Sequence, residues 1–286
     1  LTLVALWIRE QSGGRTKIAL VGKPSCSTDP FSLIIVGGEV QIPPGPHVHR
    51  TSLPLLRVDE DAVARAADEW RDRLADLPRP LIALCVGGPT NPFAFTRGVE
   101  DGLVALARDV AEKQGGTPYV TTSPRTPPDT VAALKAKLPA AAQFFEFRPN
   151  APDNPYRALL GLADGFIVTG DSISMLVEVA KLHRPLAIYP LPYAMIHKAD
   201  RVRRRFARWL YSEGDETETD GLRRVLLKTG RALHALPRTR DFTAVHDLLI
   251  DRGLAVPAGA ALRPSSGDVP NDLPAVVARV RALVGR

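Results

Sequence analysis

Hydrophobic positions from Pro80 onward alternate between short apolar runs and longer segments with helical spacing. The short runs predict strands at Leu81–Val86, Pro118–Thr122, Gln143–Phe147, Gly165–Thr169 and Leu186–Tyr189. The longer segments predict helices at Arg97–Gln114, Asp129–Leu138, Tyr156–Ala163 and Ser172–Leu182. Such alternation builds right-handed βαβ units, in which helices cover both faces of a parallel sheet. The pattern therefore predicts an α/β fold.

The amino-terminal part has a less regular pattern. The helical spacing of Leu3, Leu6 and Trp7 predicts a helix that ends before Gly13. Short β-branched or apolar runs then predict strands at Lys17–Val21, Ser32–Val36 and His47–Thr51. A charged helix is expected at Glu60–Leu77. Because the chain opens within a helix, we expect an amino-terminal domain that lacks an upstream segment.

The composition is that of a globular protein. The chain has 286 residues, of which 45% are hydrophobic and 24% are charged, and this excludes a mainly disordered chain. At roughly 150 residues per domain, the length predicts about two domains. We expect a partial amino-terminal domain at 1–59, a larger domain at 60–219 and a helical tail at 220–286. No apolar run approaches the roughly 18 residues of a membrane span, which excludes an integral membrane protein.

The net charge of +6 favours anionic partners such as nucleotides, lipid head groups or nucleic acid. The cysteines, Cys26 and Cys85, lie far apart, which favours a reducing, cytoplasmic compartment over a disulfide framework. Abundant Arg and Ala with few Lys are typical of a GC-rich bacterial genome. The dinucleotide fingerprint, the Walker motif and the usual zinc spacings are absent. His47 and His49 have no third ligand in view, so no metal site is expected.

Polar loops follow three of the predicted strands, and the carboxyl ends of parallel strands are where open α/β sheets bind ligands. The first loop holds Gly87, Gly88 and Thr90, whose backbone amides could face a phosphate. The alternative for this loop is an ordinary tight turn. The second holds Ser123 and Arg125, which can hold a phosphate through hydroxyl and guanidinium groups. The alternative there is a helix cap with a solvated arginine.

The third loop turns directly into a helix, and helix N-termini attract anions. Asp171 or Ser172 is expected to cap that helix, leaving the amides around Ile173, Ser174 and Met175 as a diphosphate site. Glu178, one turn further on, could accept hydrogen bonds from a ribose, or it could be a solvated carboxylate. Ser172 also follows Gly170-Asp171 as in one esterase family, but its usual partner motif is absent, so a serine hydrolase is a weaker alternative.

A predicted amphipathic helix spans Ala199–Tyr211. Its apolar stripe comprises Val202, Phe206, Trp209 and Leu210, and its basic face comprises Arg201, Arg204, Arg205 and Arg208. The basic face is either a solvated surface or a contact with an anionic membrane or substrate phosphate. Nucleic acid is not expected, because no aromatic stacking platform accompanies the arginines.

Several stretches of the chain resemble one family, in the order that the family has them. They are Phe31–Val36, Gln41–Val48, Leu53–Leu55, Val86–Pro89, Thr122–Pro127, Asn154–Tyr156 and, most strongly, Val168–Glu178. Together they resemble the mitochondrial-fission-protein-like family, which in bacteria is described as a domain of unknown function. The three ligand-competent loops also resemble the nucleotide-binding half of GT-B glycosyltransferases.

The resemblance implies two Rossmann-like domains in a GT-B-like arrangement, and similarity to enzymes that transfer N-acetylglucosamine from UDP. It implies that Gly87, Gly88 and Ser172–Met175 face the diphosphate and Glu178 the ribose, while Asn154 and Tyr156 lie beside the base. Two positions depart from the family pattern. Pro124 stands where the family usually has a second arginine, and His47 where it has asparagine. Both departures weaken the expected phosphate and cleft contacts.

These observations favour a protein that binds a UDP-linked sugar and requires no further cofactor. If it is an enzyme, the expected reaction is metal-independent glycosyl transfer, with helix amides stabilising the departing diphosphate. No catalytic base is assigned. The alternatives are a non-catalytic scaffold or a peripheral membrane protein on the same fold, and a serine hydrolase that uses Ser172.

Overall fold

The computed structural model describes residues 2–24, 28–194, 198–211, 218–232, 236 and 238–285. Within it the chain forms two compact units. Unit 1 comprises Leu1–Leu55, Ala199–Val245 and Pro270–Arg286, and unit 2 comprises Leu56–Lys198 and His246–Val269. Segments of the expected tail at 220–286 thus contribute to both units, and the domain boundaries expected from the sequence stay predictions.

Unit 2 is built on a six-stranded sheet in which every neighbouring pair is parallel. The strands are β5 (Leu81–Val86), β6 (Thr117–Thr122), β7 (Gln143–Phe145), β8 (Gly165–Thr169), β9 (Leu186–Tyr189) and β11 (Val256–Pro257). Their spatial order is β11-β9-β8-β5-β6-β7, the strand order of a Rossmann fold. The predicted α/β fold is therefore confirmed.

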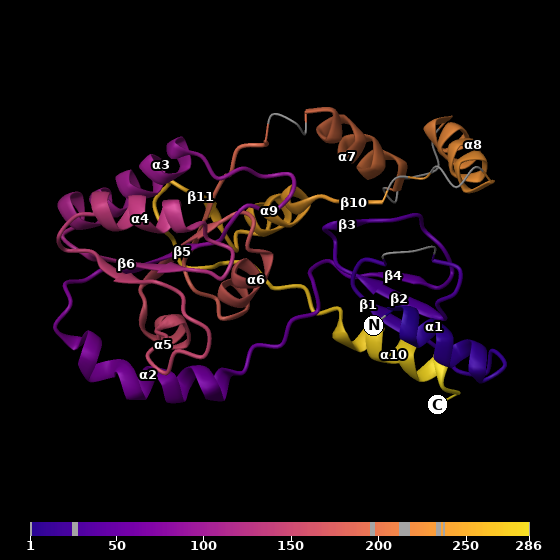
Figure 1. Cartoon of the computed structure of the whole chain (residues 1–286), viewed down its shortest axis with the longest axis horizontal. Coiled ribbons are helices and arrows are strands. Elements are labelled where there is room, and N and C mark those ends of the chain that lie inside the picture. The colour runs from indigo at the N-terminus through magenta and orange to yellow at the C-terminus, as the bar shows by residue number, and fades with distance from the viewer. Residues whose placement is uncertain are drawn as a thin grey trace. The chain divides into compact units, whose positions relative to one another are not determined.

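Helices cover both faces of this sheet, as Figure 1 shows: α3 and α4 lie on one face and α2 and α5 on the other. The helices of unit 2 are α2 (Glu60–Ala75), α3 (Arg97–Arg108, continued by a π-helical turn at Asp109–Lys113), α4 (Pro128–Lys137), α5 (Tyr156–Leu162) and α6 (Ile173–Lys181). α9 (Phe242–Asp251) begins in unit 1 and continues into unit 2. β5 lies inside the sheet, and all of its residues are buried, so its uninterrupted apolar run matches its central position.

α2 illustrates why the helical spacing was informative. The side chain of Asp59 accepts a hydrogen bond from the backbone amide of Ala62 and caps the helix. The buried residues of α2 recur every three or four positions, and the helix packs against α5. They are Val63, Ala67, Trp70 and Leu74.

Unit 1 has a smaller parallel sheet with the order β1-β2-β4 and a separate antiparallel pair of β3 with β10. Its strands are β1 (Ala19–Val21), β2 (Leu33–Val36), β3 (Val40–Gln41), β4 (Val48–Arg50) and β10 (Thr239–Arg240), and its further helices are α1 (Thr2–Gln11), α7 (Lys198–Tyr211), α8 (Glu218–Ala232) and α10 (Leu273–Leu283). Alternate residues of β2 point to opposite faces. Ile34 packs in the cluster that includes Leu6 of α1, and Ile35 packs in the cluster that includes Val276 of α10.

Candidate functional site

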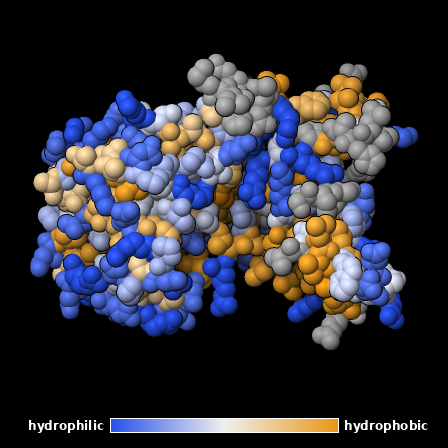
Figure 2. Space-filling model, viewed as in Figure 1, coloured by the Kyte–Doolittle hydropathy of each residue, from blue (hydrophilic) through white to orange (hydrophobic). Residues whose placement is uncertain are grey.

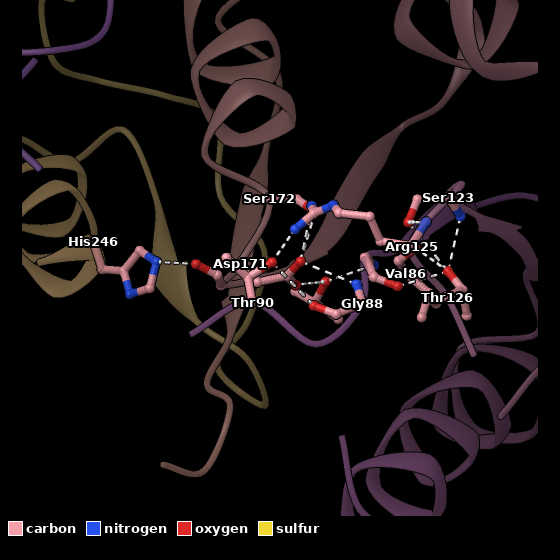
Figure 3. Close-up of polar contacts among 12 residues, drawn as sticks. Val86, Gly88, Thr90, Ser123, Arg125, Thr126, Asp171, Ser172 and His246 are labelled. Carbon is pink, nitrogen blue, oxygen red and sulfur yellow. Dashed lines mark hydrogen bonds and ion pairs between the residues drawn. The ribbon is translucent and has the colours of Figure 1, made fainter. Parts of the chain in front are cut away.

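The candidate site lies at the carboxyl ends of β5, β6 and β8 in unit 2. β5 is the first strand of this sheet along the chain, and the fold proceeds to β6 on one side of it and to β8 on the other. Open α/β sheets bind ligands at such a switch point, because the loops leaving it diverge to opposite faces. The loops after these strands approach one another, and Figure 3 shows Gly88, Arg125 and Asp171 in one network of polar contacts.

Arg125 joins the three loops. Its Nη2 lies 2.9 Å from Oδ2 of Asp171 and donates to Oγ of Ser172 at 3.2 Å. Its Nη1 donates to the hydroxyl of Thr90. The Asp171 side chain is 0% exposed, whereas the Arg125 side chain is 43% exposed. The guanidinium group therefore reaches from a buried carboxylate toward solvent, where an anionic ligand could meet it.

The protein's own oxygen atoms engage the backbone amides of Gly87 and Gly88, and a phosphate at these amides stays a prediction. Gly88 donates to Oδ2 of Asp171 at 3.0 Å, and Gly87 donates to Oγ1 of Thr169 at 2.8 Å. Thr169 in turn donates to Oδ1 of Asp171 at 2.7 Å. At Gly88 the Asp171 carboxylate thus supplies a negative charge where the sequence analysis expected a diphosphate, whereas at Gly87 the acceptor is the neutral Thr169 hydroxyl.

Both glycines are required by close packing within the protein. A Cβ at Gly87 would lie 2.5 Å from Oγ of Ser172 and closer still to the Asp171 carboxylate. A Cβ at Gly88 would overlap the carbonyl group of Arg125. The small residues therefore let the three loops approach one another, which is the same property that lets a backbone approach a phosphate.

The second loop is a turn held by Thr126, a residue that the sequence analysis did not select. Its hydroxyl donates to the carbonyl of Gly87 at 2.6 Å and accepts from the amide of Ser123 at 2.9 Å. The alternative for this loop, a cap of the next helix, is wrong. Pro127 is the N-cap residue of α4, and no side chain caps that helix. The Thr126-Pro127 sequence indicates a turn. It does not indicate that the Thr126 hydroxyl bonds to Gly87, which follows a different strand.

The amino end of α6 has the predicted position. Ser172 is its N-cap residue without a side-chain cap, and the first amide that bonds within the helix is Leu176, which donates to the Ser172 carbonyl at 3.0 Å. The amides of Ile173, Ser174 and Met175 precede that bond and carry the positive end of the helix dipole. Ser174 is exposed, Met175 is half-buried and Ile173 is buried.

Glu178, Tyr156 and Asn154 are linked to one another. The Tyr156 hydroxyl donates to Oε2 of Glu178 at 2.5 Å, and the Asn154 side chain accepts from the amide of Tyr156 at 3.0 Å. Burial, with the nearby Cys85 and Glu178, raises the pKa of Tyr156 well above its usual value. The sequence placed these residues beside a base and a ribose, and the structure shows that they bind each other.

Replacing Tyr156 with phenylalanine should lower the free energy of unfolding by about 2 kcal/mol, because it removes a partly buried hydrogen bond to a carboxylate. Urea unfolding measures this change. Tyr119→Phe is the matched control, because Tyr119 is buried and its hydroxyl has no hydrogen bond to the described residues. Equal effects of the two substitutions would contradict a stabilising Tyr156–Glu178 bond.

His246 also borders the site and was not selected from the sequence. Its Nε2 lies 2.6 Å from the carbonyl oxygen of Gly170, and its ring stacks on Phe93 at a centroid distance of 6.4 Å. A Cβ at Gly170 would lie 2.7 Å from Cε1 of His246, so this glycine too permits close packing. No local signal points to His246, because it comes from α9, far along the chain.

The hydrolase alternative has no geometric support. In the part of the chain that the structure describes, Ser172 bonds to Arg125 and Asp171, and no histidine bonds to its hydroxyl.

The described residues contain no group of three or more His, Cys, Asp or Glu side chains that could hold a metal ion. Among the described helices, none combines the length and the apolar character needed to cross a bilayer.

The prediction for α7 is wrong in part. Arg204, expected on the basic face, is only 7% exposed and faces inward with Ala207 and Tyr211, whereas Val202 and Phe206 of the expected apolar stripe are exposed. Nε of Arg208 lies 2.7 Å from Oδ2 of Asp241, and this ion pair holds the Arg208 guanidinium group against the protein.

Arg205, by contrast, is exposed, as the basic face requires. The side chain of Arg201 lies outside the described residues. The four arginines therefore do not form one free basic face.

Comparison with known proteins places these loops in a family. The family model described as "Mitochondrial fission ELM1" matches residues 2–220, which is more than half of the chain. The chain belongs to the mitochondrial fission ELM1 family. A relative from Arabidopsis thaliana, named mitochondrial fission protein ELM1, is 27% identical over 146 residues. The match covers 51% of this chain and 34% of that relative, so the chain spans about a third of its length. The family match includes the three loops of the candidate site.

Proposed function

We propose that unit 2 binds a nucleotide-sugar, with its diphosphate between Arg125 and the amino end of α6. One observation carries the proposal: a partly exposed guanidinium group and a helix amino end meet at the switch point of a Rossmann-like sheet. Both features attract anions. Arg125 follows β6, and α6 follows β8. The uracil base and the N-acetylglucosamine-type sugar rest on the resemblance to UDP-dependent transferases.

The Asp171 carboxylate would compete with a bound diphosphate at this site. Its carboxylate is already paired with Arg125, so an incoming diphosphate competes with it for the guanidinium group. Ser172, whose hydroxyl also contacts Arg125, could donate to the ligand when that contact opens. Glu178 can offer its second carboxylate oxygen to a ribose while Oε2 remains bonded to Tyr156. If the site is catalytic, Arg125 and the α6 amides would stabilise the departing diphosphate without a metal ion.

Calorimetry with UDP, ADP, GDP and UDP-N-acetylglucosamine tests this proposal. We expect selective binding of the uridine ligands, and Arg125→Gln should weaken it about 10- to 100-fold, as expected for the loss of charge-assisted hydrogen bonds. Arg71→Gln is the matched control, because Arg71 is an exposed arginine on α2 paired only at the surface with Asp68. Equal affinities of the Arg125→Gln and Arg71→Gln variants would contradict the site.

A non-catalytic scaffold on the same fold is the second proposal. The ion pair of Arg125 with Asp171 favours it, because the protein itself already neutralises the guanidinium group of the site. A folded protein that binds none of the four nucleotides would support it. In either role we propose a cytoplasmic protein, which could also bind peripherally to a membrane.

A further inference from the structure

Exposed hydrophobic side chains are concentrated in unit 1. Among the described residues, every large hydrophobic side chain that is exposed belongs to this unit, in or next to α1, β1, α7, α8 and α10. Figure 2 shows hydrophobic residues on the surface over α1 and α10. Soluble proteins rarely gather such side chains at the surface unless a partner or a membrane meets them. Unit 1 therefore presents the apolar surface of the described chain.

The helix α1 has the most exposed of these side chains. They are Leu3, Val4, Trp7 and Ile8, and their exposed fractions run from 45% for Ile8 to 80% for Leu3. Leu3 and Trp7 are four residues apart, as are Val4 and Ile8, so all four side chains lie on one face of the helix. We call this set the outer face of α1.

The other side of α1 is fixed to the body of unit 1. Ala5 and Leu6 pack against the core cluster that contains Ile34 of β2. The guanidinium group of Arg9 donates to the carbonyl of Pro30, which lies in the loop before β2. Turning the outer face inward would break these contacts, so its exposure is a stable feature of the fold.

The charge of the chain is segregated in the same way. By sequence, unit 1 has 19 Lys and Arg against 11 Asp and Glu, a net charge of +8, whereas unit 2 has 18 against 20, a net charge of −2. Close to the outer face, Arg15 and Lys17 follow α1 directly and are both exposed. An apolar face on a cationic unit complements an anionic lipid surface. A second copy of the chain fits less well, because two units of charge +8 repel each other.

Two properties of α1 also suit the surface of a bilayer. Trp7 is 59% exposed, and an indole ring, with an apolar body and a polar N–H, favours the boundary between lipid and water. The helix has ten residues and is therefore about 15 Å long, half the thickness of a bilayer's hydrocarbon core of about 30 Å. Such a helix lies in the plane of the interface and does not cross it.

We propose that unit 1 binds the surface of an anionic lipid bilayer through the outer face of α1. Leu3, Val4, Trp7 and Ile8 enter the boundary between head groups and acyl chains, and Arg15 and Lys17 meet the lipid phosphates. The proposal gives a defined surface to the peripheral membrane binding proposed above. It does not depend on nucleotide binding by unit 2.

Sedimentation with phosphatidylcholine vesicles, with and without phosphatidylglycerol, tests this surface. We expect binding to the vesicles that contain phosphatidylglycerol, and this binding should weaken as the salt concentration rises. Trp7→Glu should weaken it about 10- to 100-fold, as expected for the loss of one inserted aromatic side chain. Trp7→Phe keeps an apolar ring and should retain most of the binding. Equal binding to both kinds of vesicle would overturn the proposal.

Leu222→Glu is the matched control for Trp7→Glu. Leu222 lies in α8 of the same unit and is 55% exposed, so the substitution adds the same charge at a similar exposure away from α1. The control should bind vesicles as the wild type does. Equal weakening by the two substitutions would show that the outer face of α1 has no particular role, and the proposal would fail.

Fluorescence quenching by phosphatidylcholine with brominated acyl chains, mixed with phosphatidylglycerol, locates the inserted residue in the unmodified chain. We expect quenching of the wild type that is lost in Trp7→Phe, because Trp70 is buried and Trp209 is half-buried. No quenching of the wild type would overturn the proposal. So would a dimer, seen by sedimentation equilibrium and lost in Trp7→Glu, in a chain that binds no vesicles. Arg125→Gln should leave vesicle binding unchanged, so a failure of the nucleotide site is read separately.

Discussion

Replacing Gly88 with alanine is expected to lower the free energy of unfolding by about 3 kcal/mol. The new Cβ would overlap the carbonyl carbon and oxygen of Arg125 and would lie 2.7 Å from its Cβ. These are backbone and near-backbone atoms, so no side-chain rotation relieves the overlap. The loop after β6 must move, and that movement breaks the bond from Thr126 to the Gly87 carbonyl. Urea unfolding followed by circular dichroism measures the loss.

Gly98→Ala is the matched control for this substitution. Gly98 lies in α3, where an added Cβ would meet only Oγ1 of Thr96, at an ordinary distance of 3.7 Å. Alanine should stabilise that exposed helical position by about 0.5–1 kcal/mol. Because Gly88→Ala also displaces Arg125, it should weaken nucleotide binding as well. A Gly88→Ala protein as stable as the wild type would show that the two loops do not pack this closely.

Replacing Asp171 with alanine is expected to cost about 2–3 kcal/mol, because it leaves several polar groups without their acceptor. The buried carboxylate accepts from the Gly88 amide and from Thr169, and it pairs with Arg125. The cost is below that of a fully buried ion pair, because Arg125 can turn to solvent. Chemical denaturation again measures the change. Asp153→Ala, which breaks only the exposed pair with Arg148, should change stability by less than about 0.5 kcal/mol.

Asp171→Asn separates stability from ligand binding. Asparagine keeps the shape and an acceptor for the Gly88 amide, but it removes the charge that holds Arg125. If a diphosphate competes with this carboxylate, the variant should bind UDP more tightly than the wild type while being less stable. Weaker UDP binding by Asp171→Asn would instead show that the carboxylate itself supports the ligand.

Much of unit 2 could be predicted from the sequence. The bounds of β5, β8 and β9 match the predicted ranges, because buried parallel strands are uninterrupted apolar runs. The sequence did not reveal β3, β10 and β11. Each has only two residues, too few for a periodicity, and their pairing partners are distant along the chain. The sequence predicts a single helix over Arg97–Gln114, whereas the structure has α3 followed by a π-helical turn. The apolar pattern does not show this difference, because a local change of hydrogen bonding leaves that pattern intact.

The candidate site was predictable in position but not in detail. Gly88, Arg125 and Asp171 were selected because each follows a parallel strand, and such strands end at one edge of the sheet. That Asp171 pairs with Arg125, and that Tyr156 bonds to Glu178, depended on distances between segments that no motif encodes. The inward position of Arg204 likewise depended on how α7 packs within unit 1.

The sequence by itself determined the α/β fold, the family and the sheet edge where the polar loops meet. The fold and the sheet edge follow from local periodicity and from the alternation of strands and helices, which neighbouring residues specify. The family follows from the motifs that the chain shares with it. Only the tertiary structure decided which polar group each loop residue binds and which arginines face inward. A hydrogen bond or an ion pair depends on the positions of atoms far apart in the chain, and packing alone sets those positions.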